Sequence, residues 1–188
     1  DLCSEENLRR VTGEEDLRSV RNLALTVDTN VTQVEHLGGL MPALAELRLE
    51  RGSTLASFRD LGSSLKNIRV LWLSACGVRH LDGVGALLGL EELYLAFNDV
   101  DDLTSIAMHD RLQVLDLESN SVQDAEQALQ LDTCPRLWSL TLVGNPVCRD
   151  TYYRRMIVEA IPSLASLDEQ DVTDIDRCPP PMSGDGPD

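Results

Sequence analysis

Basic side chains are scarce in this 188-residue sequence, where 16 Lys and Arg residues are outnumbered by 32 Asp and Glu residues and the formal net charge is −16 at pH 7. Nucleic acids and anionic membranes are bound by basic surfaces, so we expect neither as a partner. No apolar run approaches the roughly 18 residues of a membrane span. No secretory signal is visible. Because Asp1 stands where Met would open a complete chain, the sequence is compatible with a fragment of a longer protein.

Paired cysteines are also missing. The five cysteines are an odd number and include no C-x-x-C pair. Disulfide-bonded secreted domains and zinc ribbons need such pairs, so the pattern indicates a reducing, intracellular compartment. We expect Cys76 and Cys134 to be buried thiols.

The sequence contains no arrangement of residues typical of catalysis. Its three histidines fall at unrelated points, and none has a carboxylate or Cys at the spacing of a metal site. There is no glycine loop of the kind that binds phosphate, and no nucleophile paired with a base. We therefore predict a protein that is not an enzyme and that uses no cofactor and no metal.

What the sequence does contain is a repeat, written L-x-x-L-x-L-x-x-[NC]-x-V. Clear copies span residues 68–78, 90–100, 112–122 and 137–147, and weaker copies lie near 20–28 and 44–52. The second leucine falls at residues 23, 47, 71, 93, 115 and 140, so the steps are 24, 24, 22, 22 and 25 residues. A period in this range is typical of leucine-rich repeats, which stack as a curved solenoid.

The repeat predicts an α/β fold, a right-handed leucine-rich repeat solenoid of about six repeats with a parallel sheet on its concave face and short helices on its convex face. Alternate residues of a strand point to opposite faces, so the leucines of each L-x-L enter the core. The Asn or Cys follows at a bend, where its side chain can bond backbone groups. The residues predicted to be structural are Leu71, Leu73, Cys76, Leu93, Leu95, Asn98, Leu115, Leu117, Asn120, Leu140, Leu142 and Asn145.

Four segments are expected along the chain. Residues 1–19 form an N-terminal capping segment, 20–147 the repeats, 148–168 a C-terminal cap with a helix, and 169–188 an acidic tail rich in Pro and Gly that is predicted to be disordered. The tail's acids are expected to keep the chain soluble, with an interaction tail as the alternative. We expect the whole to be a monomeric domain.

Local features refine the two ends. Thr12 and Glu15 match a capping box that would open a short helix. Tyr153 is predicted to pack its ring inside the C-terminal cap. Asp28 and Gly52 occupy the bend position of the first two repeats, which predicts less regular packing there.

The residues between the leucines form the predicted concave face. Aromatic residues make up only 4% of the sequence, yet Trp72, Tyr94, Phe97 and Trp138 all fall at positions predicted to face solvent. Such placement is typical of a contact surface for a protein partner. The alternative is a ladder of side chains that stabilises the sheet across its strands. The predicted partner-binding residues are Arg48, Val70, Trp72, Tyr94, Phe97, Val114, Asp116, Glu118 and Trp138.

The position between the second and third leucines should form a row on this face, because neighbouring strands lie about 4.8 Å apart. The row reads Ala24, Arg48, Trp72, Tyr94, Asp116 and Thr141. Arg48 is expected to lie over the Trp72 indole. Arginines dominate the first half of the face and acids the second half, so a partner of opposite polarity would be oriented as well as attracted.

The short repeats ending in N-x-V, the turn Asn145-Pro146, the pair Tyr153-Arg154 and the terminal L-x-x-L-D at 164–168 resemble the capped, SDS-twenty-two-like class of leucine-rich repeats. The stretches DLRSVRNLAL, FRDLGSSLKNIRVLWL, ELYLAFNDVDDL, LQVLDLESNSV and CPRLWSLTLVGN are similar to a ciliary family of this class. That resemblance implies a cytoplasmic and axonemal adaptor, with dynein arm or intraflagellar transport components as partners, in the assembly or transport of outer dynein arms in motile cilia or flagella. The wider class leaves two alternatives, a regulatory subunit of a protein phosphatase and a ribonucleoprotein scaffold.

Overall fold

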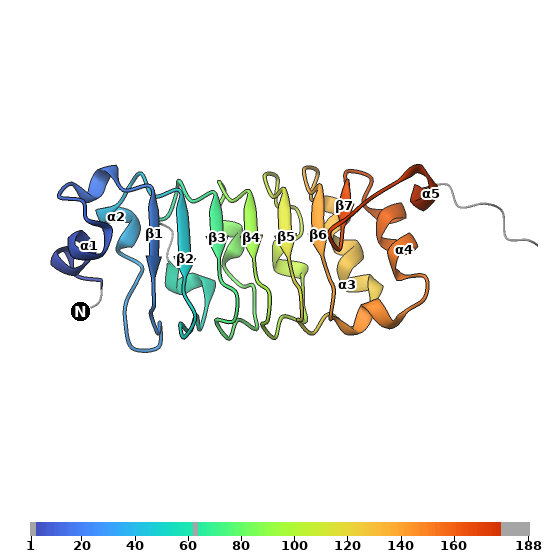
Figure 1. The fold of residues 1–188 in the computed structure, drawn as a ribbon, viewed down its shortest axis with the longest axis horizontal. Coiled ribbons are helices and arrows are strands. Elements are labelled where there is room, and N and C mark those ends of the chain that lie inside the picture. Colours follow the sequence, from blue (N-terminus) through green and yellow to red (C-terminus); the bar gives the residue numbers. More distant parts are fainter. Residues whose placement is uncertain (1–2, 62–63, 178–188) are drawn as a thin grey trace, which may run out of the picture.

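The chain coils into a solenoid whose strands form one long sheet, as the computed structural model shows for residues 3–61 and 64–177 (Figure 1). The described residues contain eight strands that pair in chain order. They are β1 (Asn22–Leu25), β2 (Glu46–Leu49), β3 (Val70–Trp72), β4 (Glu92–Tyr94), β5 (Val114–Asp116), β6 (Ser139–Thr141), β7 (Ser166–Leu167) and β8 (Gln170–Asp171). All pairs from β1 to β7 are parallel, and β8 returns antiparallel to β7. The predicted leucine-rich repeat solenoid is confirmed.

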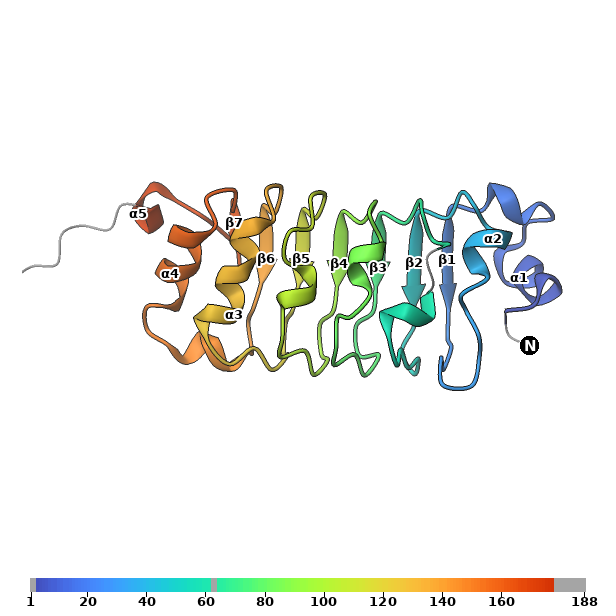
Figure 2. The same ribbon diagram turned by 180° about the vertical axis from the view of Figure 1, so that it is seen from behind.

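Short helices cover the opposite side of the sheet, as the view from behind shows (Figure 2). The return segments hold α2 (Leu37–Leu40), η2 (Phe58–Leu61), η3 (Val84–Ala86), η4 (Thr104–Ile106), α3 (Ala125–Leu129) and η5 (Gln130–Thr133), where η marks a 3₁₀ helix. Each complete coil has only 22 to 25 residues, so its return segment has little room for a longer helix, which explains why most of these elements are a single turn.

The core is a ladder of leucines shared between coils. The second leucine of each repeat pairs in register with its neighbours, so Leu47, Leu71, Leu93 and Leu115 line up across the sheet. All of these side chains are fully buried. Since no coil has enough apolar surface to bury its own leucines, each one is stabilised by the coils on both sides. The structural role predicted for these leucines is consistent with this packing.

The bend asparagines satisfy backbone groups that the coils would otherwise bury without partners. The Oδ1 atom of Asn98 accepts hydrogen bonds from the backbone N–H groups of Cys76, at 3.1 Å, and Val78, at 2.9 Å. Its Nδ2 atom donates to the carbonyl oxygens of Leu73 and Leu95. Asn120 and Asn145 repeat this arrangement one and two coils later. These contacts join each bend to the preceding coil.

Cysteine replaces the amide in the third repeat. Cys76 is fully buried, and its Sγ atom contacts the carbonyl oxygen of Ser74 at 3.5 Å. Cys134 is also fully buried and donates to the carbonyl oxygen of Ile106. Both cysteines are therefore buried thiols, as the sequence predicted.

The second repeat contains one extra residue, and the sequence assignment of its bend was wrong by one position. Gly52 lies on the surface with a φ of 95°, and Ser53 takes the buried bend position instead. The Ser53 hydroxyl accepts from the Val27 N–H at 3.1 Å and faces the Leu25 carbonyl at 3.5 Å. A hydroxyl thus does for the first two coils what an amide does for the later ones. Their strands stay in register, so the irregular packing expected from Asp28 and Gly52 is absent from β1 and β2.

The N-terminal cap is a helix that begins earlier than the sequence predicted. Helix α1 (Glu5–Thr12) starts after Ser4, whose side chain accepts from the Asn7 N–H. Thr12 is the last residue of α1, and Gly13 ends the helix with a φ of 73°. The capping box predicted at Thr12 is therefore wrong, because a left-handed glycine directly after that residue terminates the helix. A 3₁₀ turn, η1 (Leu17–Ser19), then leads into β1.

The C-terminal cap covers the open end of the last repeat. Turn η6 (Pro146–Arg149) is followed by α4 (Tyr153–Ala160), whose buried residues Ile157 and Val158 pack on the core. The Tyr153 ring is buried, and its hydroxyl donates to a carboxylate oxygen of Asp168. The other Asp168 oxygen accepts from the backbone N–H groups of Leu142 and Val143. This aspartate therefore replaces acceptors that the backbone of a further coil would supply, as the Thr141 carbonyl does for the Leu117 N–H.

Part of the predicted tail is structured. Residues 170–177 form β8 and α5 (Asp174–Arg177), which corrects the disorder predicted from residue 169 onward for this stretch. Arg154 of α4 forms an ion pair with Asp176 of α5 at 2.9 Å and donates a hydrogen bond to the Leu167 carbonyl of β7, so it joins α5 to the cap. The arginine lowers the pKa of the Asp176 carboxyl. Residues 178–188, the rest of the tail, lie outside the described residues. In the described part of the chain, no helix has the length and apolar character needed to cross a bilayer.

Replacing Asn98 with Ala tests the bend contacts. The substitution leaves the N–H groups of Cys76 and Val78 and the carbonyl of Leu73 buried without their partner, so we expect the free energy of unfolding to fall by about 2–4 kcal/mol. Urea denaturation measures the loss, and Asp99→Ala, on the exposed neighbour, serves as the control. Equal stability of the two variants would contradict the role assigned to the amide.

The stability of the fold should fall between pH 9 and 11. Burial raises the pKa of the Cys76 thiol from 9.0 to about 11. As pH rises, the thiol ionises in the unfolded chain before it does so in the folded one. Its contribution to the free energy of unfolding is therefore fully present below pH 9 and is lost between pH 9 and 11. From this one group the free energy of unfolding falls by at most about 1.4 kcal/mol per pH unit. Denaturation curves across this range should show a smaller slope for Cys76→Ala than for the parent. Identical slopes would rule out a contribution from this thiol.

Candidate interaction site

The row of side chains predicted on the outer face of the sheet is present. Ala24 pairs with Arg48, Arg48 with Trp72, Trp72 with Tyr94, and Tyr94 with Asp116 in successive strand pairs. The outer face of the sheet, called the sheet face below, is the predicted concave surface. Its register follows directly from the leucine ladder, because alternate residues of the same strands point away from the core.

Arg48, Trp72 and Tyr94 form a three-layer stack on the sheet face. The Trp72 and Tyr94 ring centroids are 3.7 Å apart with an interplanar angle of 4°. The Cζ atom of Arg48 lies 4.5 Å from the Trp72 ring centroid, a distance within cation–π range. This is the position over the indole that the sequence predicted. Strand spacing sets this geometry, since three flat groups on adjacent parallel strands stack at about the separation of the strands.

Carboxylates hold both rings in place. The Trp72 Nε1–H donates to Glu46 at 2.9 Å, and the Tyr94 hydroxyl donates to Glu92 at 2.7 Å. Burial, the hydrogen bond to Glu92 and nearby acids raise the pKa of Tyr94. Both rings are half-buried rather than fully solvent-facing, which corrects the sequence prediction for these two residues. The reason is the stack itself, in which each ring covers one face of the other.

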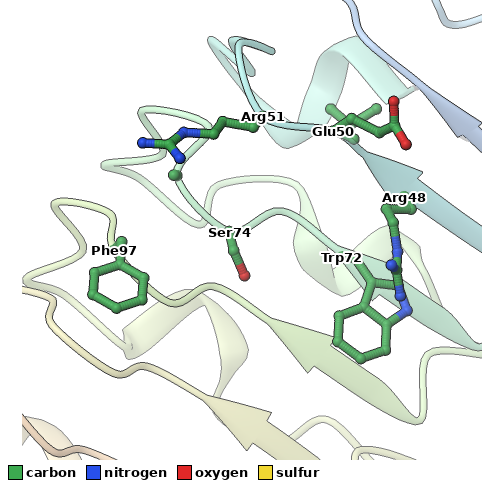
Figure 3. A pocket seen from close by; sticks show the side chains of 8 residues that line it. Arg48, Glu50, Arg51, Trp72, Ser74 and Phe97 are labelled. Carbon is green, nitrogen blue, oxygen red and sulfur yellow. The ribbon is translucent and has the colours of Figure 1, made fainter.

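A hollow of about 710 Å³ opens beside the stack, at the edge where the strands end (Figure 3). Arg48 and Trp72 line one side, and Phe97 lies across from them. The loops after β2 and β3 complete the lining with Leu49, Glu50, Arg51, Ser74 and Ala75. We call this space the aromatic hollow. It is the place where predicted site residues from three coils come together.

Phe97 is held in a conformation that bulky residues seldom adopt. Its φ is 60°, in the left-handed region, and its side chain is 57% exposed. The same position of other coils is Ala75, Ser119 and Gly144, all with positive φ, so the bend of the coil imposes this conformation. Glycine would adopt it without cost, whereas a side chain with a Cβ is strained by roughly 1–2 kcal/mol. Folding alone therefore gives no reason for a large ring at this position.

The other predicted site residues are not all gathered at the aromatic hollow. Val70 and Val114 are half-buried on the sheet face, one row further from it. Asp116 is half-buried, accepts from the Glu118 N–H at 2.9 Å, and has a pKa raised chiefly by burial. Trp138 is 46% exposed, but it precedes β6 at the opposite end of the strands. The structure thus brings together Arg48, Trp72 and Phe97, keeps Tyr94 in the stack, and leaves Trp138 apart.

Some residues of the hollow were missed by sequence reasoning. Ser74 and Ala75 line it beside Arg51, yet neither was predicted to be a site residue. They follow the strand by two and three positions, where the loop turns out over the sheet edge. Ala75 and Phe97 share a positive φ at the same position of their coils. The sequence carries no signal for this conformation, because neither residue is a glycine. Arg69 of the predicted basic half and Glu91 of the predicted acidic half form an ion pair at 2.7 Å, where the two halves meet.

The chemistry available here is that of recognition. The hollow offers an exposed ring, an indole edge, two guanidinium groups and one carboxylate. In the described part of the chain, no three His, Cys, Asp or Glu side chains are grouped so that they could hold a metal ion. An open cavity of this size and lining suits an apolar or aromatic side chain presented by another protein.

Comparison with known proteins places the chain among leucine-rich repeat proteins. The leucine-rich repeat family model matches residues 39–179. Leucine-rich repeat-containing protein 56 of Rattus norvegicus is 41% identical over 182 residues, which are 90% of this chain and 33% of that protein. The similarity agrees with the resemblance identified from the sequence motifs. The chain spans about a third of the length of this curated relative.

Two further proteins are more distantly similar. Dynein axonemal assembly factor 11 of Trypanosoma brucei brucei is 27% identical over 153 residues, covering 81% of this chain and 40% of that protein. The crystal structure of an internalin from Listeria monocytogenes superposes with a TM-score of 0.63 at 19% identity, covering 86% of this chain and 54% of the internalin chain. The latter likeness concerns the fold alone.

Substitutions at Phe97 and Trp72 should affect stability differently. Phe97→Gly relieves the left-handed strain but adds freedom to the unfolded chain, so the free energy of unfolding should stay within about 1 kcal/mol of the parent. Trp72→Ala removes the ring from a stack and the partner from Glu46, and should cost about 1–3 kcal/mol. Thermal and urea unfolding measure both. A loss at Phe97→Gly as large as that at Trp72→Ala would mean that the Phe97 ring stabilises the fold.

Proposed function

Since this chain belongs to the leucine-rich repeat family, we propose that it is a non-enzymatic scaffold that binds a protein partner at the aromatic hollow on its sheet face. The observation that carries the proposal is Phe97, an exposed ring kept in a strained backbone conformation at the rim of a cavity. Because Ala75 and Ser119 share this conformation, the strain belongs to the bend. What folding does not explain is a large exposed ring at this position, and such rings are typical of contact surfaces.

The three aromatic residues contribute to the proposed site in different ways. Trp72 and Tyr94 are fixed by their mutual stacking and by Glu46 and Glu92, so they offer a rigid surface that loses little entropy when a partner binds. Phe97 offers exposed apolar area that a partner can cover. Rigid aromatic anchors next to an exposed ring are typical of the few residues that supply most of the energy of an interface.

Charge around the hollow favours one orientation of the partner. Arg48 and Arg51 line the hollow on the side of β2, whereas Glu92 and Asp116 follow along the sheet face toward β5. A partner segment with an acidic end and a basic end would match this order, and rim charges of this kind mainly affect the rate and direction of association.

The biological setting proposed here is the motile cilium. We infer that the chain acts in the cytoplasm and axoneme as an adaptor in the assembly or intraflagellar transport of outer dynein arms. Support comes from the relatives named leucine-rich repeat-containing protein 56 and from the more distant dynein axonemal assembly factor 11. Because the chain spans about a third of the former, the partners of the whole protein belong to this proposal.

Affinity capture from an extract of ciliated cells tests the proposal. Mass spectrometry of the proteins captured by the parent chain should identify axonemal dynein or transport proteins. Phe97→Ala should reduce their affinity for the chain about 30-fold, since loss of a central aromatic contact costs about 2 kcal/mol. Leu88→Ala, which removes an even more exposed apolar side chain on the helical side, should leave capture unchanged.

Other outcomes discriminate the alternatives. Recovery of a phosphatase catalytic subunit through the same surface would favour a phosphatase regulator, and recovery of spliceosomal proteins would favour a ribonucleoprotein scaffold. Capture that tolerates both Phe97→Ala and Trp72→Ala would remove the aromatic hollow as the binding site.

A further inference from the structure

A second hollow, of about 440 Å³, lies at the opposite edge of the sheet, where the strands begin. Its charged lining residues are Arg21, Lys66, Arg69 and Arg111, which come from the segments that lead into β1, β3 and β5. We call it the basic hollow. It shares no lining residue with the aromatic hollow.

The basic hollow runs against the charge of the molecule. Four of the 16 basic residues of a chain with net charge −16 line one cavity, and no acidic residue lines it with them. Arg69 is paired with Glu91. Within residues 3–61 and 64–177, Arg21, Lys66 and Arg111 make no ion pair, and all three side chains are exposed. These three cations are therefore available to an anion that enters the cavity.

Small residues keep the cavity open between these cations. Ala43, Ala45 and Gly89 form the neutral part of the lining. A Cβ atom at Gly89 would come within 2.9 Å of the Ile68 carbonyl oxygen, so the two coils approach closely there and no side chain fills the space. Asn67, next to Lys66, is fixed by a hydrogen bond from its Nδ2 to the Pro42 carbonyl at 2.7 Å. The cations thus surround a preformed space.

We propose that the basic hollow binds a short segment rich in Asp and Glu of a protein partner. Guanidinium groups recognise carboxylates through paired, planar hydrogen bonds, and two of the three unpaired cations are arginines. A short segment satisfies the hollow without bringing further negative charge against the acidic remainder of the surface. A nucleic acid or an anionic membrane would extend well beyond the hollow and be repelled by that remainder.

This inference stands independently of the proposed function. The basic hollow would add a second contact at the other end of the strands, and it predicts an acidic segment whichever protein carries it. A partner that contacted both hollows would be held at both ends of the strands.

Fluorescence anisotropy with a labelled ten-residue peptide of alternating Glu and Ser tests the proposal on the 188-residue chain. The peptide should bind in low salt and be released as salt rises through about 0.1 M, where screening reaches about 10 Å. The variant Arg21→Gln/Arg111→Gln should weaken binding about five- to tenfold, the effect of losing two charge-assisted contacts. Arg79→Gln/Arg136→Gln, which changes the net charge equally at exposed arginines elsewhere, should bind the peptide within about twofold of the parent.

Three results would overturn the proposal. They are no binding of the Glu peptide in low salt, equal weakening by both double variants, and tighter binding of a ten-nucleotide thymidine strand or of phosphatidylserine vesicles than of the peptide. The same peptide with Gln in place of Glu should not bind. Phe97→Gly should leave peptide affinity unchanged, which separates failure here from failure at the aromatic hollow.

Discussion

Each coil of this solenoid buries its leucines only against the coils on either side of it, and most other features follow from that dependence. The leucine ladder through Leu47, Leu71, Leu93 and Leu115 forces the strands into register. Register in turn aligns the bends, so that each bend amide can reach the backbone of the preceding coil. Since the ladder has no natural end, the chain closes it with α1 at one side and with α4 and the Asp168 turn at the other.

The leucines of each strand fill the core, so the residues between them on the sheet face are available for binding. A residue between two leucines points away from the core, so it can change without altering the ladder. The two explanations for the aromatic residues, a stabilising ladder and a contact surface, apply together to Trp72 and Tyr94, whereas only the second applies to Phe97. Trp72 and Tyr94 stack on each other and are held by carboxylates, as a ladder requires. Phe97 is exposed and strained, and only the contact surface gives it a role.

The two hollows lie at opposite ends of the same short strands and differ in chemistry. One combines an exposed ring with an indole and two arginines, and the other gathers cations around small residues. On an acidic molecule, local basic sites of this kind select short acidic features over extended polyanions. The sheet therefore presents two different recognition chemistries within the length of a few residues of extended chain.

The sequence by itself determined the solenoid, the register and the row from Arg48 to Asp116, because all three follow from a leucine period that is written locally and repeated. Tertiary structure alone decided the position of Ser53 in the second bend, since one inserted residue shifts the bend without disturbing the leucines. Tertiary structure also decided that residues 170–177 are ordered, because their conformation depends on the ion pair between Arg154 and Asp176 across the cap. The hollows belong to this second group. Their walls come from loops of different coils, and no spacing within one coil encodes which loops meet.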